Sequence, residues 1–398
     1  MGGWGCRLLV GAAFLGLGSA AAVGQTNIDV GYLHPQEREL TLSLIDRPAD
    51  DLGMSGADLA ITDNNTTGQF TGQKYTLHTE ALGDDGDPAA AVDTLADAGA
   101  RWIVADLPAD QLLAVADAAA DKNILVFNVG AQDDGLRTEN CHANIVHIAP
   151  SNAMLADALA QFLVWKKWPR WFLVEGSHAK DKAFADAIRR AATRFGGRIV
   201  EERVFEDTGG ARTTDSGHVQ VQKQLPVFMQ SASEHDVVIV ADESEVFGAY
   251  LPYHIWDPRP VAGSAGLQPK AWSPAHEQWG AIQVQNRFMD AYNRRMQPED
   301  MLAWMAVRAV GEAATRTNGG DPDAIREYIL GPDFQLAAFK GEALSLRDWN
   351  QQLRQPILLA DQKTVVSASP QEGFLHPSSF LDTLGYDRPE SACSLGSQ

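Results

Sequence analysis

The chain has 398 residues, which is too long for one small domain and suits two or three packed ones. Hydrophobic residues make up 45% of it and charged residues 21%, which excludes long disordered, collagen-like and polytopic membrane proteins as classes. The net charge of −20, with no basic patch in the sequence, excludes nucleic acid as a partner and favours a small or soluble one.

The first residues are typical of an export signal. Arg7 is followed by an apolar, Gly- and Ala-rich run from Leu8 to Leu17 and then by small residues through Ala22. This pattern predicts a secretory signal peptide over residues 1–24, cleaved near residues 22–24. The run is shorter than the roughly 20 apolar residues of a membrane span, and no later segment reaches that length. We therefore expect an exported chain that is not embedded in a membrane.

Cleavage of the signal would remove Cys6 and leave two cysteines, Cys141 and Cys393. In an oxidising compartment an even pair predicts one disulfide, which would tie the C-terminal tail, residues 369–398, to the first third of the chain. Closing so long a loop is worth roughly 4–5 kcal/mol in the loop-entropy model. The alternative is two unpaired, buried thiols.

Strand and helix patterns alternate from residue 28 to about residue 150. The apolar runs and helical periodicities predict strands at 28–33, 75–82, 102–104 and 124–129 and helices at 52–65, 88–99 and 109–121. Such alternation is typical of a parallel sheet covered by helices on both faces.

A second alternating series begins with a helix capped by Ser151. We predict strands at 170–175, 199–205 and 236–241, a helix at 179–195 and a polar surface loop at 208–217. The segment 252–274 carries five prolines and is expected to be irregular. Helices at 275–296, 298–317 and 322–330 follow, and then a hairpin of strands at 357–359 and 364–366.

The two series together predict an α/β chain with two doubly wound, Rossmann-like lobes joined by a hinge. We assign residues 25–148 plus 281–335 to the N-terminal lobe and residues 149–280 plus 336–368 to the C-terminal lobe. Ligands of open α/β sheets bind outside the carboxyl ends of the strands, so the loops that begin at Asn128, Glu175 and Asp242 are the places where we expect a binding site.

Enzyme and metal signatures are scarce. The sequence has no nucleophile elbow, no dinucleotide fingerprint and no phosphate-binding loop of the Walker type. The stretch Asp63–Gly68 has the look of a calcium loop, but Lys74 stands where a bidentate glutamate is needed. The histidines lack metal spacing. We therefore predict a protein that is not an enzyme, holds no metal and requires no cofactor.

Two groups of residues carry candidate binding chemistry. Ser177, His178 and Lys180 occupy a strand-to-helix turn, where free N–H groups and a lysine would favour an anion; a helix cap with an exposed lysine is the alternative. Trp256, Trp272 and Trp279 lie near the cations Arg259, Lys270 and Arg287, which together would suit a flat anionic ligand. Core packing is the alternative for each tryptophan.

The chain resembles a family of known proteins. The opening DVGYL and the later GADLAITDNN of residues 56–65 are similar to type I periplasmic substrate-binding proteins, the Leu/Ile/Val-binding class of ABC transporters. Longer stretches resemble the subfamily associated with alcohol dehydrogenase systems that depend on pyrroloquinoline quinone (PQQ). These stretches are DNNTTGQF at 63–70, DDGLRTENCHANIVHIAPSNAMLADALAQF at 133–162, PRPVAGSAGLQPKAW at 258–272, HEQWGAIQVQNRF at 276–288, LRQPILLAD at 353–361 and FLDTLGYDRPESAC at 380–393.

The resemblance implies a periplasmic receptor, expected to be a monomer, whose ligand is PQQ and whose partner is an ABC permease or a PQQ-dependent dehydrogenase system. Alternatives are a receptor for another small carboxylated or aromatic solute, or a sensory ligand-binding protein. Amino-acid receptors of this class carry small hydroxyl residues in the loop that falls here on Asn128–Asp133 and an acid near the loop that falls on Gly263–Gly266. This chain departs from both patterns, so a branched amino acid is not expected.

The candidate ligand-binding residues follow from these loops, from the tryptophan group and from the 133–162 stretch. They are Asn128, Gly130, Ala131, Gln132, Arg137, Ser177, His178, Lys180, Glu243, Trp256, Ser264, Trp272, Trp279 and Arg287. PQQ is planar, carries three carboxylates and has an electrophilic ortho-quinone, so it requires stacking groups and cationic donors. Lys180 is the residue that we expect to pair with the quinone or to add to it reversibly.

Overall fold

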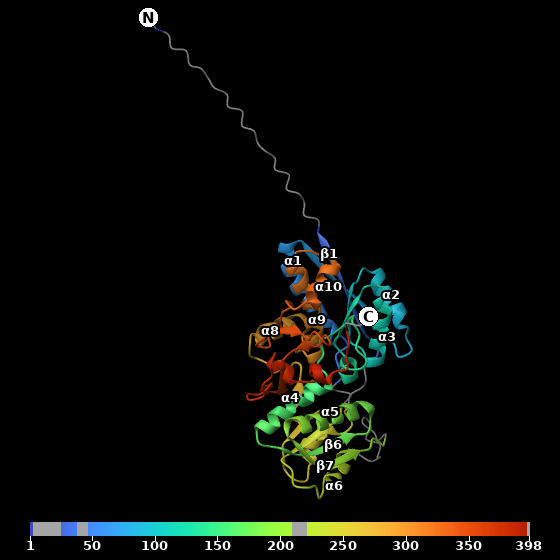
Figure 1. Ribbon diagram of the computed structural model, residues 1–398, viewed down its shortest axis with the longest axis vertical. Helices are drawn as coiled ribbons and strands as arrows, with labels where there is room; N and C mark the ends of the chain where they lie inside the picture. Colours follow the sequence, from blue (N-terminus) through green and yellow to red (C-terminus); the bar gives the residue numbers. More distant parts are fainter. Residues whose placement is uncertain (3–24, 38–46, 209–220, 396–398) are drawn as a thin grey trace.

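The computed structural model describes residues 1–2, 25–37, 47–208 and 221–395 (Figure 1). The predicted signal peptide and most of the predicted loop at 208–217 lie outside these residues. Within the described part, no helix is both long enough and apolar enough to cross a membrane.

The first lobe contains a five-stranded parallel sheet in the order β2-β1-β3-β4-β5. Its strands are β1 (Thr26–Pro35), β2 (Gln73–Leu82), β3 (Trp102–Ala105), β4 (Leu125–Asn128) and β5 (Ile145–His147). Its helices are α1 (Met54–Thr71), α2 (Pro88–Asp97), α3 (Ala109–Ala120), α8 (Ala281–Tyr292), α9 (Pro298–Arg316) and α10 (Pro322–Leu330). One face packs against α1 and α9, the other against α2 and α3, which is the two-sided cover that the sequence predicts.

The second lobe contains a four-stranded parallel sheet in the order β7-β6-β8-β9. Its strands are β6 (Arg170–Gly176), β7 (Arg198–Phe205), β8 (Val237–Ala241) and β9 (Val261–Gly263). Its helices are α4 (Asn152–Trp165), α5 (Ala179–Phe195), α6 (Val221–Phe228) and α7 (Leu251–His254). Here α4 and α5 cover one face, while residues of α6 and α7 pack in the core on the other. The α/β class with two parallel-sheet lobes is therefore confirmed.

Short antiparallel strands complete the chain. They are β10 (Gln268–Lys270), β11 (Leu336–Ala337), β12 (Ala343–Leu346), β13 (Leu353–Arg354), β14 (Ile357–Ala360) and β15 (Val365–Ser369). The predicted hairpin is confirmed as the antiparallel pair β14 and β15. Leu336, Leu344 and Leu353 pack in the core of the first lobe, whereas Ile357 and Leu359 pack in that of the second. The chain therefore passes between the lobes at residues 353–357, and the assignment of residues 336–353 to the C-terminal lobe is wrong, because their apolar side chains pack in the first core.

Two predicted helix boundaries are wrong. The helix expected to end at residue 65 continues to Thr71, because Gly72 in the left-handed conformation is what ends it. Asp63–Gly68 therefore lies inside α1 and forms no loop that could wrap around an ion. The helix expected from residue 275 begins only at Ala281, after Gly280 with its φ of 83°.

Up to residue 369, three stretches of the described chain pass between the lobes. Residues 148–151 join β5 to α4, β10 leads from the second sheet to Ala271 in the first core, and residues 354–356 join β13 to β14. Lys340 connects all of them. Its ammonium donates to Ala271 O, to Gln355 Oε1 at 2.6 Å and to Pro356 O at 3.4 Å. Gln355 in turn donates through Nε2 to Ile148 O at 2.7 Å.

This lysine is buried, with 1% of its surface exposed. Burial disfavours its charged form and lowers its pKa to about 7. The acceptors of its hydrogen bonds are carbonyl and amide oxygens rather than carboxylates. A titratable group near it is His276, whose own pKa is lowered by burial and by the Lys340 ammonium, while its hydrogen bond to Phe339 O opposes that fall. The hinge stretches are thus connected by a buried lysine whose hydrogen-bond partners carry no compensating negative charge.

Candidate functional site

The carboxyl ends of the two sheets face each other across the hinge. The chain leaves β5 at His147 and enters α4 at Asn152, so the end of the first sheet adjoins the second lobe. Likewise, β9 ends at Gly263, and β10 then leads the chain back to the first core. Open parallel sheets bind ligands at this edge, where the strand order reverses. The reversal lies between β1 and β3 in the first lobe and between β6 and β8 in the second.

In the first lobe, the loops after β3 and β4 pack tightly together. A Cβ atom at Gly130 would lie 2.8 Å from the backbone nitrogen of Leu107 and 2.9 Å from Oδ1 of Asp106. No other residue fits there without movement. Asn128 folds back on its own loop, because its Nδ2 donates to Ala131 O at 2.8 Å and its Oδ1 accepts from Ala131 N at 2.9 Å. Asn128 therefore shapes the loop that it begins.

Asp106 is a residue that the sequence-based selection missed. It follows β3 at the reversal point, is 8% exposed, and accepts a hydrogen bond from the Tyr32 hydroxyl at 3.3 Å. The signal that could have revealed it is its position directly after a buried strand of four apolar residues.

Arg137 lies beneath the same loop with 2% of its surface exposed. Its guanidinium donates to three backbone carbonyl groups and to the side chain of Gln352. The partners are Ala131 O at 3.0 Å, Asp133 O at 2.9 Å, Ala149 O at 2.8 Å and Gln352 Oε1 at 2.9 Å. Burial lowers its pKa to about 10. Arg137 thus holds the loop of Ala131 and Gln132 against the hinge, and its donors are directed to protein atoms.

In the second lobe, a buried aspartate locks the two loops at the reversal point together. Asp181 accepts from His178 N at 3.1 Å and from Ser244 N at 2.8 Å, which ties the start of α5 to the loop after β8. Asp207, after β7, pairs with His178 Nε2 at 2.8 Å and donates through its backbone N to Ser177 Oγ at 3.0 Å. His178 and Ser177 are thus positioned by protein contacts.

Asp242 and Ser264 also serve the local structure. Asp242 accepts from the backbone N–H groups of Val246 at 2.9 Å and Phe247 at 2.7 Å. Burial raises its pKa, and these hydrogen bonds oppose the rise. Ser264 accepts from Asp242 N at 2.9 Å and donates to Val240 O at 3.2 Å. Both residues stiffen the edge from which Glu243 projects.

Two charged side chains of this edge, those of Glu243 and Lys270, form no hydrogen bond or ion pair with the part of the chain that the structure describes. Burial and the carboxylates of Asp181 and Asp242 raise the pKa of Glu243 to about 7, and the Lys180 ammonium opposes that rise. Burial lowers the pKa of Lys270, while Glu299 of the first lobe and Glu243 of the second oppose that fall. Lys270, on β10, thus lies in the field of acids from both lobes.

The predicted aromatic cluster does not assemble at this edge. Trp272 is fully buried in the first core and Trp279 is 45% exposed, and both rings contact His276, at centroid distances of 5.1 and 5.2 Å. Trp256 is 60% exposed in the connection from β8 to β9. Arg287 pairs on α8 with Asp63 of α1, which also accepts from Trp304 Nε1 at 2.9 Å. Trp272 and Trp279 therefore share His276 as a neighbour, whereas Trp256 and Arg287 have other surroundings.

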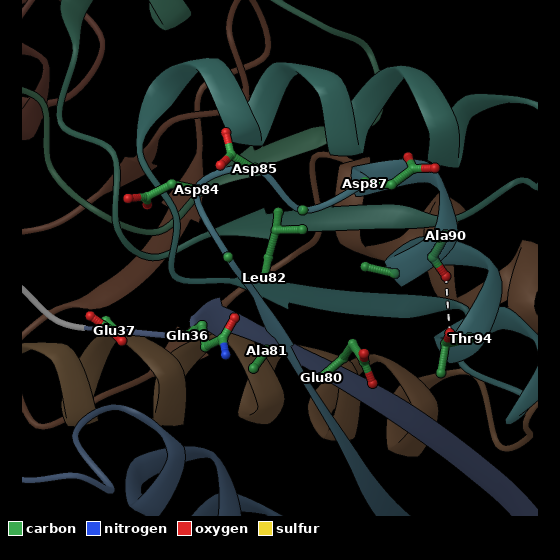
Figure 2. Close-up of a pocket in the computed structure, with 13 residues that line it drawn as sticks. Gln36, Glu37, Glu80, Ala81, Leu82, Asp84, Asp85, Asp87, Ala90 and Thr94 are labelled. Atoms are coloured by element: carbon green, nitrogen blue, oxygen red, sulfur yellow. Dashed lines mark hydrogen bonds between the residues drawn. The ribbon is translucent and has the colours of Figure 1, made fainter.

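A surface hollow of about 680 Å³ lies at the carboxyl ends of β1 and β2 (Figure 2). Its charged lining residues are all acidic: Glu37, Glu80, Asp84, Asp85 and Asp87. Because β2 is an edge strand, the hollow is displaced from the reversal point, and it shares no lining residue with the loops described above. We place the candidate site at the reversal points, not in this hollow.

Comparison with known proteins identifies the architecture. Residues 48–215 match a family model described as periplasmic binding protein. A periplasmic binding protein from Burkholderia mallei is 16% identical with a TM-score of 0.67, over 94% of this chain and 100% of that one. A branched-chain amino acid ABC transporter ligand-binding protein from Burkholderia xenovorans is 17% identical with a TM-score of 0.70, over 92% and 99%.

A third structure carries a ligand. It is the solute-binding protein of an ABC transporter from Rhodopseudomonas palustris in complex with 3,4-dihydroxybenzoic acid, 14% identical with a TM-score of 0.61, over 84% of this chain and 92% of that one. No curated protein sequence matches the chain significantly. All three of these structures are described as binding proteins.

Proposed function

We propose that this chain is a type I periplasmic binding protein that captures PQQ between its lobes for an ABC-type uptake system or for delivery to PQQ-dependent dehydrogenases. The observation that carries the binding function is the pair of facing carboxyl edges. Each edge is locked by its own buried contacts, those of Asp181 in the second lobe and Arg137 in the first. Such preorganised loops on two hinged lobes suit a receptor that closes on one small molecule.

The choice of PQQ rests on the sequence resemblance and on two cations at the site. Lys180 in the first turn of α5 and Lys270 on β10 can each pair with a ligand carboxylate. Near neutral pH a fraction of Glu243 is protonated and can donate a hydrogen bond to a quinone or carboxylate oxygen. A trianion therefore meets donors here even though the chain as a whole is acidic.

A second candidate ligand is an aromatic carboxylic acid. The structure from Rhodopseudomonas palustris has the same fold and holds 3,4-dihydroxybenzoic acid, so this architecture accommodates a flat, singly charged aromatic ring. A smaller anion would need only one of the two lysines. The two candidates differ in charge and size, so one competition experiment separates them.

The test is a calorimetric and absorbance titration of the mature protein with PQQ, followed by competition with 3,4-dihydroxybenzoate. We expect a saturable heat and, for the Lys180→Ala variant, weaker binding and an altered visible spectrum of the bound quinone. The control is Lys122→Ala, which removes an exposed lysine that pairs with Asp93 on the outside of the first lobe. If PQQ gives no heat and the benzoate gives a saturable heat, the ligand is an aromatic carboxylic acid and not PQQ. If Lys180→Ala binds PQQ with unchanged affinity and an unchanged spectrum, the proposed role of Lys180 is refuted.

A further inference from the structure

The C-terminal tail is anchored on the second lobe. Leu384 packs in the core formed by α4 and α5 and has no exposed surface. The next residue, Gly385, donates through its backbone N to Asp157 of α4 at 2.8 Å. Asp157 also pairs with Arg190 and Arg194 of α5, at 3.1 and 2.9 Å. The tail is therefore part of the packing of the second lobe.

The same tail is also anchored on the first lobe. Cys393 forms a disulfide with Cys141, as the sequence predicts, across a separation of 252 residues. Ser391 Oγ donates to Arg137 O at 2.9 Å. Upstream, Asp382 accepts from Arg347 Nε at 2.9 Å, and these two side chains are 0% and 1% exposed. Arg347 belongs to β12–β13, the segment whose leucines pack in the first core.

We propose that residues 371–393 form an interlobe strap, clasped by the Cys141–Cys393 bond, that limits how far the two lobes move apart. The three crossing stretches allow the lobes to rotate about the hinge. The tail is attached to both lobes at points outside these stretches, so it restricts that rotation. Because one attachment is covalent, the restriction persists for as long as the disulfide is intact. The strap acts on the protein without ligand, so it does not depend on what the cleft binds.

Hydrogen exchange at two backbone amides reports the proposed motion. The amide of Asn152 donates to Gln132 O at 2.9 Å and that of Ala153 donates to Asp134 Oδ1 at 3.0 Å. Both bonds join the start of α4 to the loop after β4 in the other lobe. In the reduced protein and in the Cys141→Ser/Cys393→Ser variant, we expect these amides to exchange on the order of tenfold faster, over times too short for the amides of β6 and β8, which are protected until the chain unfolds globally, to exchange.

Two controls make the result interpretable. Reductant should have no effect on the double serine variant, which lacks the clasp. Asp382→Asn keeps the disulfide but weakens the buried pair with Arg347, and we expect it to speed exchange at the same two amides. Unchanged exchange at Asn152 and Ala153 after reduction would overturn the proposal. Equal acceleration throughout both lobes would also overturn it, because the bond would then only stabilise the fold.

Discussion

Lys340→Met tests whether the side-chain nitrogen of Lys340 is buried at the hinge without a carboxylate partner, which is what lowers its pKa. The folded-state pKa of Lys340 is about 7, below its ordinary value of 10.5. Between these values the unfolded chain binds a proton that the folded chain does not. This residue therefore makes the free energy of unfolding rise as pH increases from 7 to 10.5, by up to about 1.4 kcal/mol per pH unit. Over the whole window the contribution is on the order of 5 kcal/mol.

Urea denaturation of the wild type and of Lys340→Met between pH 7.5 and 9.5 measures this slope. Other titrating groups cancel in the comparison, so the variant should show a rise in unfolding free energy that is smaller by about 2–3 kcal/mol. Lys122→Met is the control, because it removes an exposed lysine that pairs with Asp93, and it should retain the wild-type slope. Parallel pH profiles for the wild type and Lys340→Met would refute the assignment of a depressed lysine to the hinge.

Three further predictions concern other contacts. Cys141→Ser/Cys393→Ser should lower the free energy of unfolding by about 2–5 kcal/mol in urea titrations under oxidising conditions, because the unfolded chain loses its loop constraint; an equal midpoint and slope would contradict this. Gly56→Ala should cost more than about 2 kcal/mol of stability, since its Cβ would lie 1.8 Å from Asp300 O of α9; a variant that melts with the wild type would show that the helices separate freely. Glu243→Gln should bind PQQ more tightly than the wild type at pH 8 and similarly at pH 5.5, because the carboxyl, with its pKa of about 7, is charged only at the higher pH; a pH-independent ratio of affinities in calorimetry would rule this out.

Local patterns in the sequence were sufficient to predict the elements and the fold class. Apolar runs of four or five residues between helical periodicities predict β3, β4 and β8, and they are buried strands because each is covered on both faces. Proline at the start of α10 and the caps at Ser151 and Asp321 define helix starts through contacts with residues a few positions away. The disulfide was predictable because only one pair of cysteines remains outside the predicted signal peptide.

The contents of the site depended on the tertiary structure. Sequence position alone brings Lys180 and Glu243 to the same sheet edge, and in the structure the Lys180 ammonium opposes the rise in the pKa of Glu243. The sequence could not show that the polar atoms of Asn128, Arg137 and Ser264 form hydrogen bonds within the protein, because their partners depend on how the loops pack. Likewise, the sequence suggests that Trp272 could stack on a ligand, but in the structure Trp272 is fully buried in the first core.

The sequence by itself determined the order of strands and helices, the division into two α/β lobes and the pairing of the cysteines, because these depend on short-range periodicity and on residue counts. Only the tertiary structure decided which residues meet at the hinge and where the C-terminal tail contacts each lobe. Lys340, Gln355 and Ile148 are far apart in the chain, and so are Asp382 and Arg347. Contacts of this kind form only when both lobes have packed, so no local sequence pattern predicts them.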